Sequence, residues 1–239
     1  MRTAAILPVK SFSMAKQRLG ASVADQVRLA LAHAMLSDVL SALRLSAGVE
    51  RTVVVTREPR AAAAARAAGA ALVADEGERG QSAAVALGVD WALAEGFERV
   101  LCVPGDCPWV DPAELDGLLE GAAGARGVVV LPDRHGTGTN GLLLSPPDAI
   151  APAFGPGSCE RHVALARAAG VSCRVHPLPS LSLDIDTGAD LDALRGALAG
   201  GAGRAPSTRS VLGAPGAAET PRPAGEDALD GAGTLASPL

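Results

Sequence analysis

The sequence lacks the features that mark several large classes of protein. Its 21 lysines and arginines are outnumbered by 26 aspartates and glutamates, which gives a formal net charge of −5. This balance argues against a protein that grips nucleic acid or an anionic membrane through a basic surface. No apolar run is long enough to cross a bilayer, and the opening MRTAAILPVK reaches Lys10 too early for a signal sequence. We therefore expect a cytoplasmic protein that acts on small molecules.

Several catalytic motifs are also missing. The chain has no GxGxxG after its first apolar run, no Walker-type lysine motif and no GxSxG elbow. Dehydrogenase, P-loop NTPase and hydrolase functions are therefore disfavoured. The cysteines form no CxxC pair and have no histidine at zinc spacing, so we expect reduced core thiols at Cys102, Cys107, Cys159 and Cys173.

What the sequence does contain is an alternation of β-rich and helical runs. The expected strands and helices take turns over residues 3–9, 22–45, 52–56, 59–68, 71–74, 82–94 and 99–104. This alternation is typical of βαβ units and predicts an α/β fold with a doubly wound, mostly parallel sheet between flanking helices. Further strands are expected near 127–131, 141–144, 172–176 and 181–185, and helices near 158–169 and 187–198.

Local signals mark helix starts and the end of the folded unit. Ser22 with Asp25, and Thr187 with Asp190, have the spacing of capping boxes, and Asp111 precedes Pro112 as an N-cap precedes a first-turn proline. From residue 200 the chain loses periodicity and fills with glycine, alanine and proline. We expect one folded domain over residues 1–199 and a disordered tail over residues 200–239.

The loops after the strands are the places to look for a ligand site, because ligands bind at the carboxyl ends of the strands in an open parallel sheet. The loop after the first strand carries Lys10, Lys16 and Arg18, which could face a triphosphate. The alternative is a solvated loop with ordinary surface lysines.

Three acids lie in or just after two other expected strands. Asp106 stands in VPGDCPWVDP, where it could hold magnesium together with substrate phosphates, although Pro-Gly-Asp is also good turn chemistry. Asp184 and Asp186 alternate with Leu183 and Ile185, which predicts two carboxylates on one face of a strand. Because two such acids repel each other unless a cation lies between them, we expect a metal site; the alternative is an edge strand with a wet face.

Two further loops are rich in glycine, hydroxyl and amide groups: DRHGTGTN (residues 133–140) and FGPGSCERH (residues 154–162). Backbone N–H groups and hydroxyls in such loops could wrap a small anion, with Arg134, Arg161 or His162 adding positive charge. The alternative is that both are simple turns.

Five segments, in this order along the chain, resemble the 2-phospho-L-lactate or phosphoenolpyruvate guanylyltransferases of coenzyme F420 biosynthesis. They are LPVKSFSMAKQRL, VPGDCPWVDP, DRHGTGTN, FGPGSCERH and SLDIDTGADL. The resemblance spans residues 1 to about 198. It implies a Rossmann-like nucleotidyltransferase fold related to the molybdenum-cofactor guanylyltransferases. It further implies transfer of GMP from GTP to phosphoenolpyruvate or 2-phospho-L-lactate with release of diphosphate, and a product that passes to the deazaflavin transferase of the pathway.

The resemblance also implies roles for particular residues. The acceptor would be held by Thr139, Gly155 and Ser158, with Arg161 and His162 beside them. We therefore call residues 133–140 and 154–162 the first and second acceptor loops. Asp106 and Asp184 would hold Mg²⁺ with Asp186 nearby, and Lys10, Lys16 and Arg18 would face the GTP phosphates. Asp106, Asp184, Lys16 and Arg18 form the expected catalytic set. Where relatives commonly carry Leu-Asn near the nucleoside, this chain has Gln81 and Ser82, so Ser82 is the expected nucleotide contact.

The expected chemistry needs no general base, because the attacking phosphate oxygen is already anionic near neutral pH. The site must align the acceptor with the α-phosphorus and neutralise the charge of the departing diphosphate. Two alternatives remain open: a related nucleotidyltransferase that uses another nucleotide or acceptor, such as 3-phosphoglycerate or the molybdenum cofactor, and a non-catalytic nucleotide-binding module.

Overall fold

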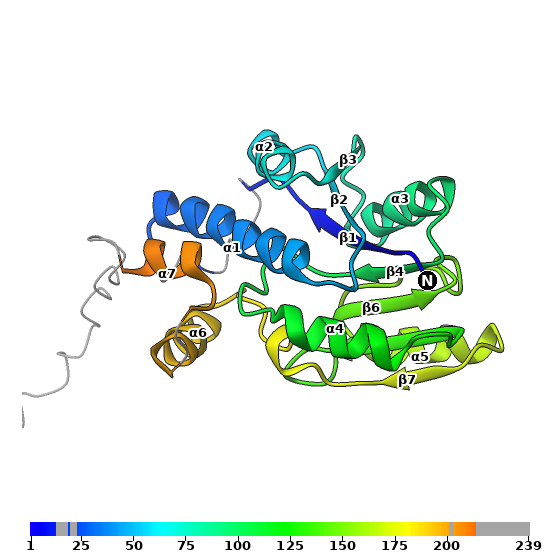
Figure 1. Cartoon of the computed structure of the whole chain (residues 1–239). Helices are drawn as coiled ribbons and strands as arrows, with labels where there is room; N and C mark the ends of the chain where they lie inside the picture. Colours follow the sequence, from blue (N-terminus) through cyan, green and yellow to red (C-terminus); the bar gives the residue numbers. More distant parts are fainter. Residues whose placement is uncertain (13–18, 20–22, 201–202, 214–239) are drawn as a thin grey trace, which may run out of the picture.

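A seven-stranded sheet forms the centre of the computed structural model, with helices on both faces (Figure 1). The structure describes residues 1–12, 19, 23–200 and 203–213. The strands lie in the order β3-β2-β1-β4-β6-β5-β7. Their bounds are β1 (Thr3–Val9), β2 (Arg51–Thr56), β3 (Ala71–Ala74), β4 (Arg99–Cys102), β5 (Gly127–Pro132), β6 (Thr139–Ser145) and β7 (Cys173–Val175). Among these strands only β6 pairs antiparallel with its neighbours, so the predicted mostly parallel α/β sheet is confirmed.

The helices are α1 (Asp25–Leu45), α2 (Pro59–Ala67), α3 (Gln81–Ala94), α4 (Pro112–Gly121), α5 (Ser158–Ala168), α6 (Gly188–Gly200) and α7 (Pro206–Leu212), with a 3₁₀ turn at Pro179–Leu181. In the described parts of the chain, none of them combines the length and apolarity that spanning a membrane requires.

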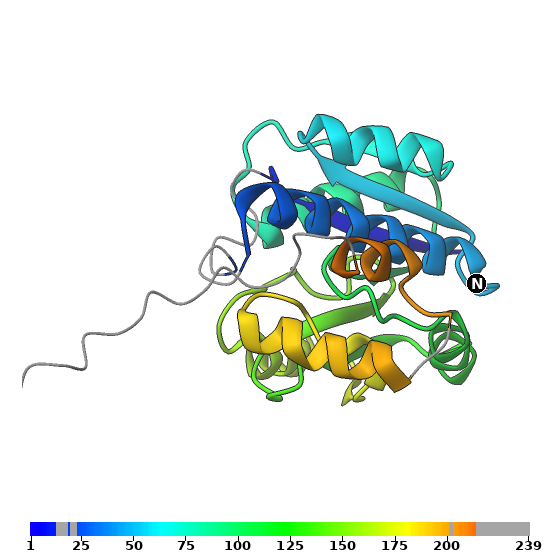
Figure 2. The same cartoon turned by 90° about the vertical axis from the view of Figure 1, so that its left-hand side faces the viewer.

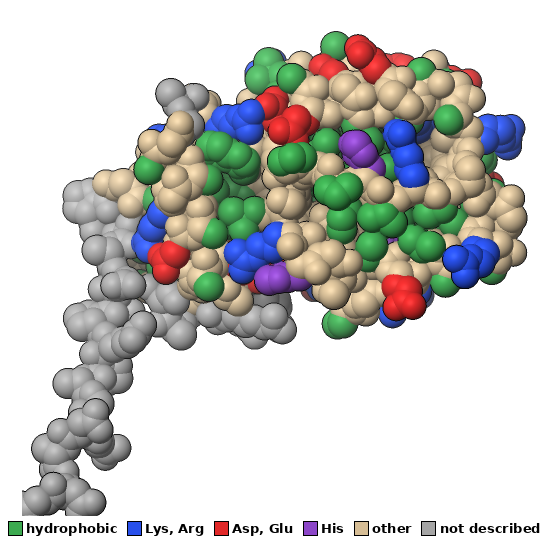
Figure 3. All heavy atoms as spheres, turned by 90° about the horizontal axis from the view of Figure 1, so that it is seen from below, with side chains coloured by type: hydrophobic (Ala, Val, Ile, Leu, Met, Phe, Trp, Pro, Cys, Tyr) green, Lys and Arg blue, Asp and Glu red, His purple; other side chains and the backbone are tan. Residues whose placement is uncertain are grey.

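In the space-filling view from below, hydrophobic side chains reach the surface in the middle of that face, and acidic and basic side chains are scattered around them (Figure 3).

The core has two layers because successive residues of a strand face opposite sides of the sheet. Ala5 and Leu7 of β1 pack with side chains of α1, α2 and α4, whereas Ala4 and Ile6 pack with side chains of α3 and α5. Gly88 lets α3 lie very close to β1, since a Cβ atom at this position would stand 2.4 Å from Cγ2 of Ile6. A third cluster joins α1 to α6 and α7.

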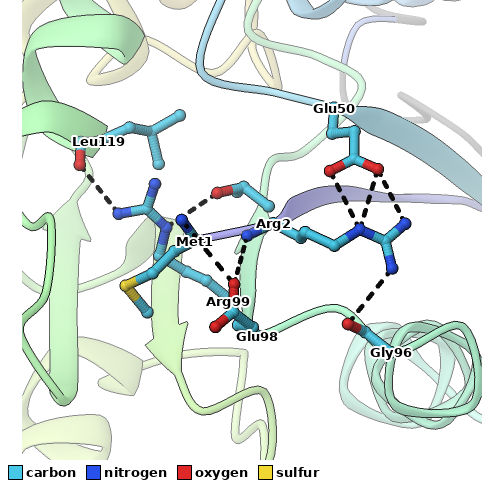
Figure 4. A network of polar contacts seen from close by, with 8 residues as sticks. Met1, Arg2, Glu50, Gly96, Glu98, Arg99 and Leu119 are labelled. Carbon is cyan, nitrogen blue, oxygen red and sulfur yellow. Dashed lines mark hydrogen bonds and ion pairs between the residues drawn. The ribbon is translucent and has the colours of Figure 1, made fainter.

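A polar network ties together the amino ends of three central strands (Figure 4). Arg2 donates through Nε and Nη2 to Oε1 of Glu50, at 3.0 and 2.8 Å, and its backbone N–H donates to Glu98 at 2.7 Å. Arg99, which is buried, donates to Oγ1 of Thr3 at 2.9 Å and to the carbonyl of Leu119 at 2.8 Å. These contacts hold the amino ends of the strands in place. The carboxyl ends of the parallel strands, on the opposite side of the sheet, remain available for a ligand site.

Two of the predicted helix starts are confirmed. Asp111 accepts a hydrogen bond from Ala113 N at the start of α4, and Thr187 and Asp190 form a reciprocal box at the start of α6. Helix α1 begins at Asp25, whose carboxylate pairs with Arg28. The predicted box of Ser22 with Asp25 stays a prediction, because Ser22 lies outside the described residues.

The strand predicted at residues 181–185 is wrong. A 3₁₀ turn at Pro179–Leu181 precedes a segment that joins no strand of the described sheet. One of its tertiary hydrogen bonds runs from Ile185 N to the carbonyl of Asp106, at 3.1 Å. Pro177 and Pro179 lack backbone N–H donors, so the chain after β7 is poorly suited to continue a ladder.

The expectation of disorder from residue 200 onward fails for residues 203–213, where the structure has helix α7. This helix lies against α1 (Figures 1 and 2). Thr208 is fully buried, and Val211 and Leu212 pack against the third cluster. Residues 201–202 and 214–239 lie outside the described residues, so the rest of the predicted tail stays a prediction.

Candidate active site

A cavity of about 490 Å³ opens at the carboxyl ends of β1 and β4. The sheet continues through β2 and β3 on one side of β1 and through β4 on the other, so the cavity lies at the point where the strand order reverses. Doubly wound sheets bind their ligands at this point. Among the predicted site residues, Lys10, Asp106 and Asp186 line the cavity, together with Gln81 at the start of α3.

Two carboxylates accept hydrogen bonds from the loop after β1 and hold it in place. The backbone N–H and the hydroxyl of Ser11 both donate to Oε1 of Glu78, at 3.0 and 2.5 Å, and these bonds hold the pKa of Glu78 below its usual value. Phe12 N donates to Glu58 at 3.0 Å. Lys10 is exposed at the mouth of the cavity. The predicted phosphate contacts Lys16 and Arg18 lie outside the described residues.

The three predicted metal-binding acids lie close to one another. The hydrogen bond from Ile185 N to the Asp106 carbonyl joins the two segments that carry them. Partial burial, and to a smaller extent the charges of Asp106 and Asp186, raise the pKa of Asp184, although a hydrogen bond from Asn140 opposes the shift. Nδ2 of Asn140 donates to Oδ1 of Asp184 at 3.1 Å. This concentration of negative charge would be relieved by a cation.

The acids fit magnesium through the chemistry of the donor set. Magnesium is usually held by one or two carboxylates, with water and substrate phosphates completing its shell. Asp106 and Asp186 both face the cavity, whereas Asp184 is engaged by Asn140. Within the described ranges, no three histidine, cysteine or acidic side chains are arranged as a ready-made metal cage. A site built from two carboxylates and a nucleotide triphosphate needs no such cage.

The two acceptor loops meet around a buried histidine. Thr139 begins β6 and Ser158 begins α5, and both side chains are buried. His162 has no exposed surface, and its ring nitrogens contact Oγ1 of Thr139 at 3.1 Å and Ala153 N at 2.9 Å. Burial lowers the pKa of His162 to about 4. The expectation that His162 adds positive charge is therefore wrong near neutral pH, because its ring is neutral there.

The two arginines of these loops make structural contacts. Arg134 pairs with Asp190 at 2.5 Å and so fastens the first acceptor loop to the start of α6; its expected role as added charge for an anion stays a prediction. Arg161 donates to the carbonyls of Ala153 and Pro156, at 3.0 and 2.9 Å, and thus supports the turn that contains Gly155. Gly155 has a φ of +114°, which side-chain-bearing residues rarely adopt.

Ser82 connects helix α3, whose first residue lines the cavity, to the second acceptor loop. Its hydroxyl accepts a hydrogen bond from Phe154 N at 2.8 Å. Ser82 is half-buried at the second position of α3, and its neighbour Gln81 lines the cavity. The predicted nucleotide contact at Ser82 therefore coincides with a bridge to the acceptor loop.

Sequence reasoning missed three residues that shape the site: Glu58, Glu78 and Asn140. The first two hold the loop after β1, and the third holds Asp184. A signal for Glu78 was present, since the polar run DEGERG directly follows β3 and so lies at the same edge of the sheet as the other loops. Asn140 ends the DRHGTGTN segment, but its partner lies 44 residues away and could not be identified from sequence.

The sequence is similar to those of known guanylyltransferases. A model of the family described as "Guanylyl transferase CofC like" matches residues 3–203. The chain is 50% identical over 213 residues to a phosphoenolpyruvate guanylyltransferase of Conexibacter woesei, and the match covers 89% of this chain and 96% of the relative. It is 36% identical over 191 residues to a 2-phospho-L-lactate guanylyltransferase of Methanothermobacter thermautotrophicus, covering 80% and 83% of the two chains.

Solved structures share the fold at lower sequence identity. A nucleotide-diphospho-sugar transferase from Desulfovibrio desulfuricans superposes with a TM-score of 0.73 at 17% identity, covering 89% of this chain and 94% of that one. A nucleotidyl transferase from Methanothermobacter superposes with a TM-score of 0.56 at 21% identity, covering 82% and 97%. These likenesses bear on the fold alone, and they agree with the expected nucleotidyltransferase architecture.

Proposed function

The chain belongs to the CofC-like guanylyltransferase family and is a nucleotidyltransferase, and from this premise we propose that it transfers GMP from GTP to phosphoenolpyruvate. The choice of acceptor rests on relatives with that name, which include the one that is 50% identical. 2-Phospho-L-lactate is the second acceptor to test, because a relative named for it is 36% identical.

The observation that carries the proposal is the cavity at the reversal of strand order. There Asp106 and Asp186 face the same space as Lys10. Carboxylates beside an exposed ammonium group suit a metal-bound triphosphate better than a neutral ligand. Magnesium held at Asp106, with Asp184 or Asp186, would supply charge neutralisation at the phosphates. Lys10 would contact the same phosphates from the mouth of the cavity, and Ser82 lies next to Gln81 on the nucleoside side.

In the proposed reaction an oxygen of the acceptor phosphate attacks the α-phosphorus of GTP. A new phosphorus–oxygen bond forms while the bond to the bridging oxygen of diphosphate breaks, and diphosphate leaves with its electron pair. No proton has to be removed, because the attacking oxygen is already anionic. The contribution of the chain is to hold the two anions in line, with Thr139, Gly155 and Ser158 placing the acceptor. Arg161 supports that loop through backbone carbonyls.

The product is an activated phosphoanhydride, which a deazaflavin transferase would consume. We place this sequence of reactions in the cytoplasm, as expected from the sequence.

The direct test is to incubate the protein with GTP, Mg²⁺ and each of phosphoenolpyruvate, 2-phospho-L-lactate and 3-phosphoglycerate, and to identify products by mass. Parallel reactions with ATP, CTP and UTP test the nucleotide. We expect a GMP adduct of phosphoenolpyruvate and release of diphosphate. A product only with another nucleotide, or no product with any acid, would contradict the proposal.

A variant pair sharpens this test. Asp106→Asn preserves shape and removes charge from the cavity, so turnover should fall at least about a hundredfold, which corresponds to about 3 kcal/mol of transition-state stabilisation. The matched control is Asp90→Asn, because Asp90 is an exposed acid on α3 that does not line the cavity. Near wild-type turnover of the Asp106 variant at saturating Mg²⁺ would show that Asp106 does not hold the metal.

A further inference from the structure

His162 has a single possible proton arrangement in its neutral form. The backbone N–H of Ala153 can only donate, so the ring nitrogen it contacts at 2.9 Å, Nε2, must carry a lone pair. The ring proton therefore resides on Nδ1. That nitrogen lies 3.1 Å from Oγ1 of Thr139, so the ring donates to the hydroxyl and the hydroxyl oxygen accepts.

This arrangement decides what the Thr139 hydroxyl can do. Its oxygen accepts a hydrogen bond from the Nδ1–H group of His162, and its own hydrogen remains available for another acceptor. Within the parts of the chain that the structure describes, the hydroxyl has no other hydrogen-bond partner. A group fixed as a donor favours an ionised carboxylate or phosphate, since these oxygens only accept.

The histidine also stands where three segments of the site meet. Its own helix, α5, begins in the second acceptor loop, and the Phe154 and His162 rings pack in a T-shaped arrangement with the centroids 5.1 Å apart. Phe154 N in turn donates to Ser82 on α3. Cys159 N donates to the carbonyl of Thr137 in the first acceptor loop, at 3.1 Å. A substitution of His162 would therefore perturb the acceptor loops more than the nucleotide cavity.

From these contacts we infer that His162 is a positioning residue that orients the Thr139 hydroxyl to donate to the anionic acceptor, without touching that acceptor itself. The Nε2 contact with Ala153 holds the second acceptor loop in place, and the Nδ1 contact sets the direction of the hydroxyl. The inference rests on the proposed function, because it assigns the acceptor anion as the partner of Thr139.

Two substitutions test the contacts of the two ring nitrogens separately. In His162→Asn the amide nitrogen can take the place of Nδ1 and still donate to Thr139, while the contact with Ala153 is lost. In His162→Gln the amide oxygen can reach the place of Nε2 and accept from Ala153 N, while the donor to Thr139 is lost. We expect His162→Gln to raise the KM for phosphoenolpyruvate about tenfold and to leave the KM for GTP unchanged. We expect His162→Asn to keep the acceptor KM within about threefold of wild type but to lower Tm.

A double-variant cycle tests whether His162 acts through Thr139. In a Thr139→Val background, which has no hydroxyl, adding His162→Gln should change the acceptor KM by less than about twofold. If the two effects instead multiply, or if His162→Gln raises the KM for GTP as well, the inference is overturned.

A spectroscopic measurement on the unmodified protein covers the case in which the variants fail to fold. Two-bond ¹⁵N–¹H correlations of the His162 ring distinguish a proton on Nδ1 from one on Nε2, and we expect the Nδ1 pattern. An Nε2 proton would overturn the inference whatever the activity. Failure of the wild-type protein to use any phosphorylated acid would instead overturn the proposed function, so the two failures are distinguishable.

Discussion

Helix α7 is capped by a side chain from a different helix, and this contact can be measured. Ala205, at the N-cap position of α7, has no side chain that could accept a hydrogen bond. Asp38 of α1 accepts instead from Ser207 N at 3.0 Å and from Thr208 N at 2.8 Å. Asp38 is only 5% exposed, so water is a poor substitute for these donors. We predict that Asp38→Ala destabilises the full chain through the loss of α7.

The expected magnitude follows from these two bonds. Losing an N-cap costs about 0.5–2 kcal/mol, and a hydrogen bond to a charged group contributes about 1.5–3 kcal/mol, from which the cost of burying the carboxylate must be subtracted. We expect a net loss of about 2 kcal/mol in the free energy of unfolding. For a chain of this size, that loss lowers Tm by about 4–8 °C.

A thermodynamic cycle isolates the contact. The cycle compares four proteins by urea and thermal unfolding. They are the full chain and a chain that ends at residue 202, each with and without Asp38→Ala. The shortened chain also loses Arg204, which pairs with Asp111 and stacks on Trp109, so it should be less stable than the full chain. In the shortened chain, however, Asp38→Ala should cost close to nothing, because the donors of α7 are gone.

The control is a chain ending at residue 213, which keeps all of α7 and should unfold like the full chain. The reasoning is refuted if Asp38→Ala costs the same in the full and shortened chains. Equal stability of the chains ending at residues 202 and 213 would also refute it. Either result would mean that α7 does not dock through Asp38.

Three further predictions concern the site. Thr139→Ala and Ser158→Ala should each lower kcat/KM for the acceptor by about ten- to a hundredfold and spare the KM for GTP, and steady-state kinetics with the reverse pattern would assign these loops to the nucleotide. Glu78→Ala should release the Ser11 loop and raise the KM for GTP several-fold without changing the acceptor KM; unchanged GTP kinetics would show that the loop needs no such support. Because His162 titrates near 4 when folded and near 6.5 when unfolded, its stabilising contribution is complete above about pH 6.5 and is lost as the pH falls through about 4. Tm measured over this range should therefore fall less in His162→Asn than in wild type, and parallel curves would contradict the assignment.

The sheet could be predicted from sequence because local patterns suffice for most of its elements. Apolar runs alternate with helical runs, and the structure has a strand or helix at nearly every expected place. Residues 183–186 show the limit of this approach. Ile185 is buried while Asp184 and Asp186 are partly exposed, which is the burial pattern expected of a strand, yet no sheet edge pairs with this segment. Periodicity predicts which side chains are buried, whereas strand pairing depends on a neighbour that only the fold supplies.

The candidate site was predictable in its parts but not in its pairings. The loops with unexplained polar residues were identified correctly as neighbours in space, because the carboxyl ends of parallel strands share one edge. The states of their cationic side chains were not. Arg134 pairs with Asp190, and His162 is buried between Thr139 and Ala153, where its ring is neutral near pH 7. Charge and exposure are set by partners distant in sequence, which a reading of one loop at a time cannot include.

The reversed direction of β6 explains how the acceptor loops come to lie beside the acids. In the antiparallel pair with β4, Leu142 stands opposite Cys102, so the residues before Leu142 extend past the carboxyl end of β4 toward Asp106. Asn140 is thereby close enough to donate to Asp184. If β6 ran parallel to β4, its first residues would instead lie at the amino ends of the strands, beside the Arg99 network. One antiparallel strand in an otherwise parallel sheet thus places Thr139 and the three carboxylates at the same edge.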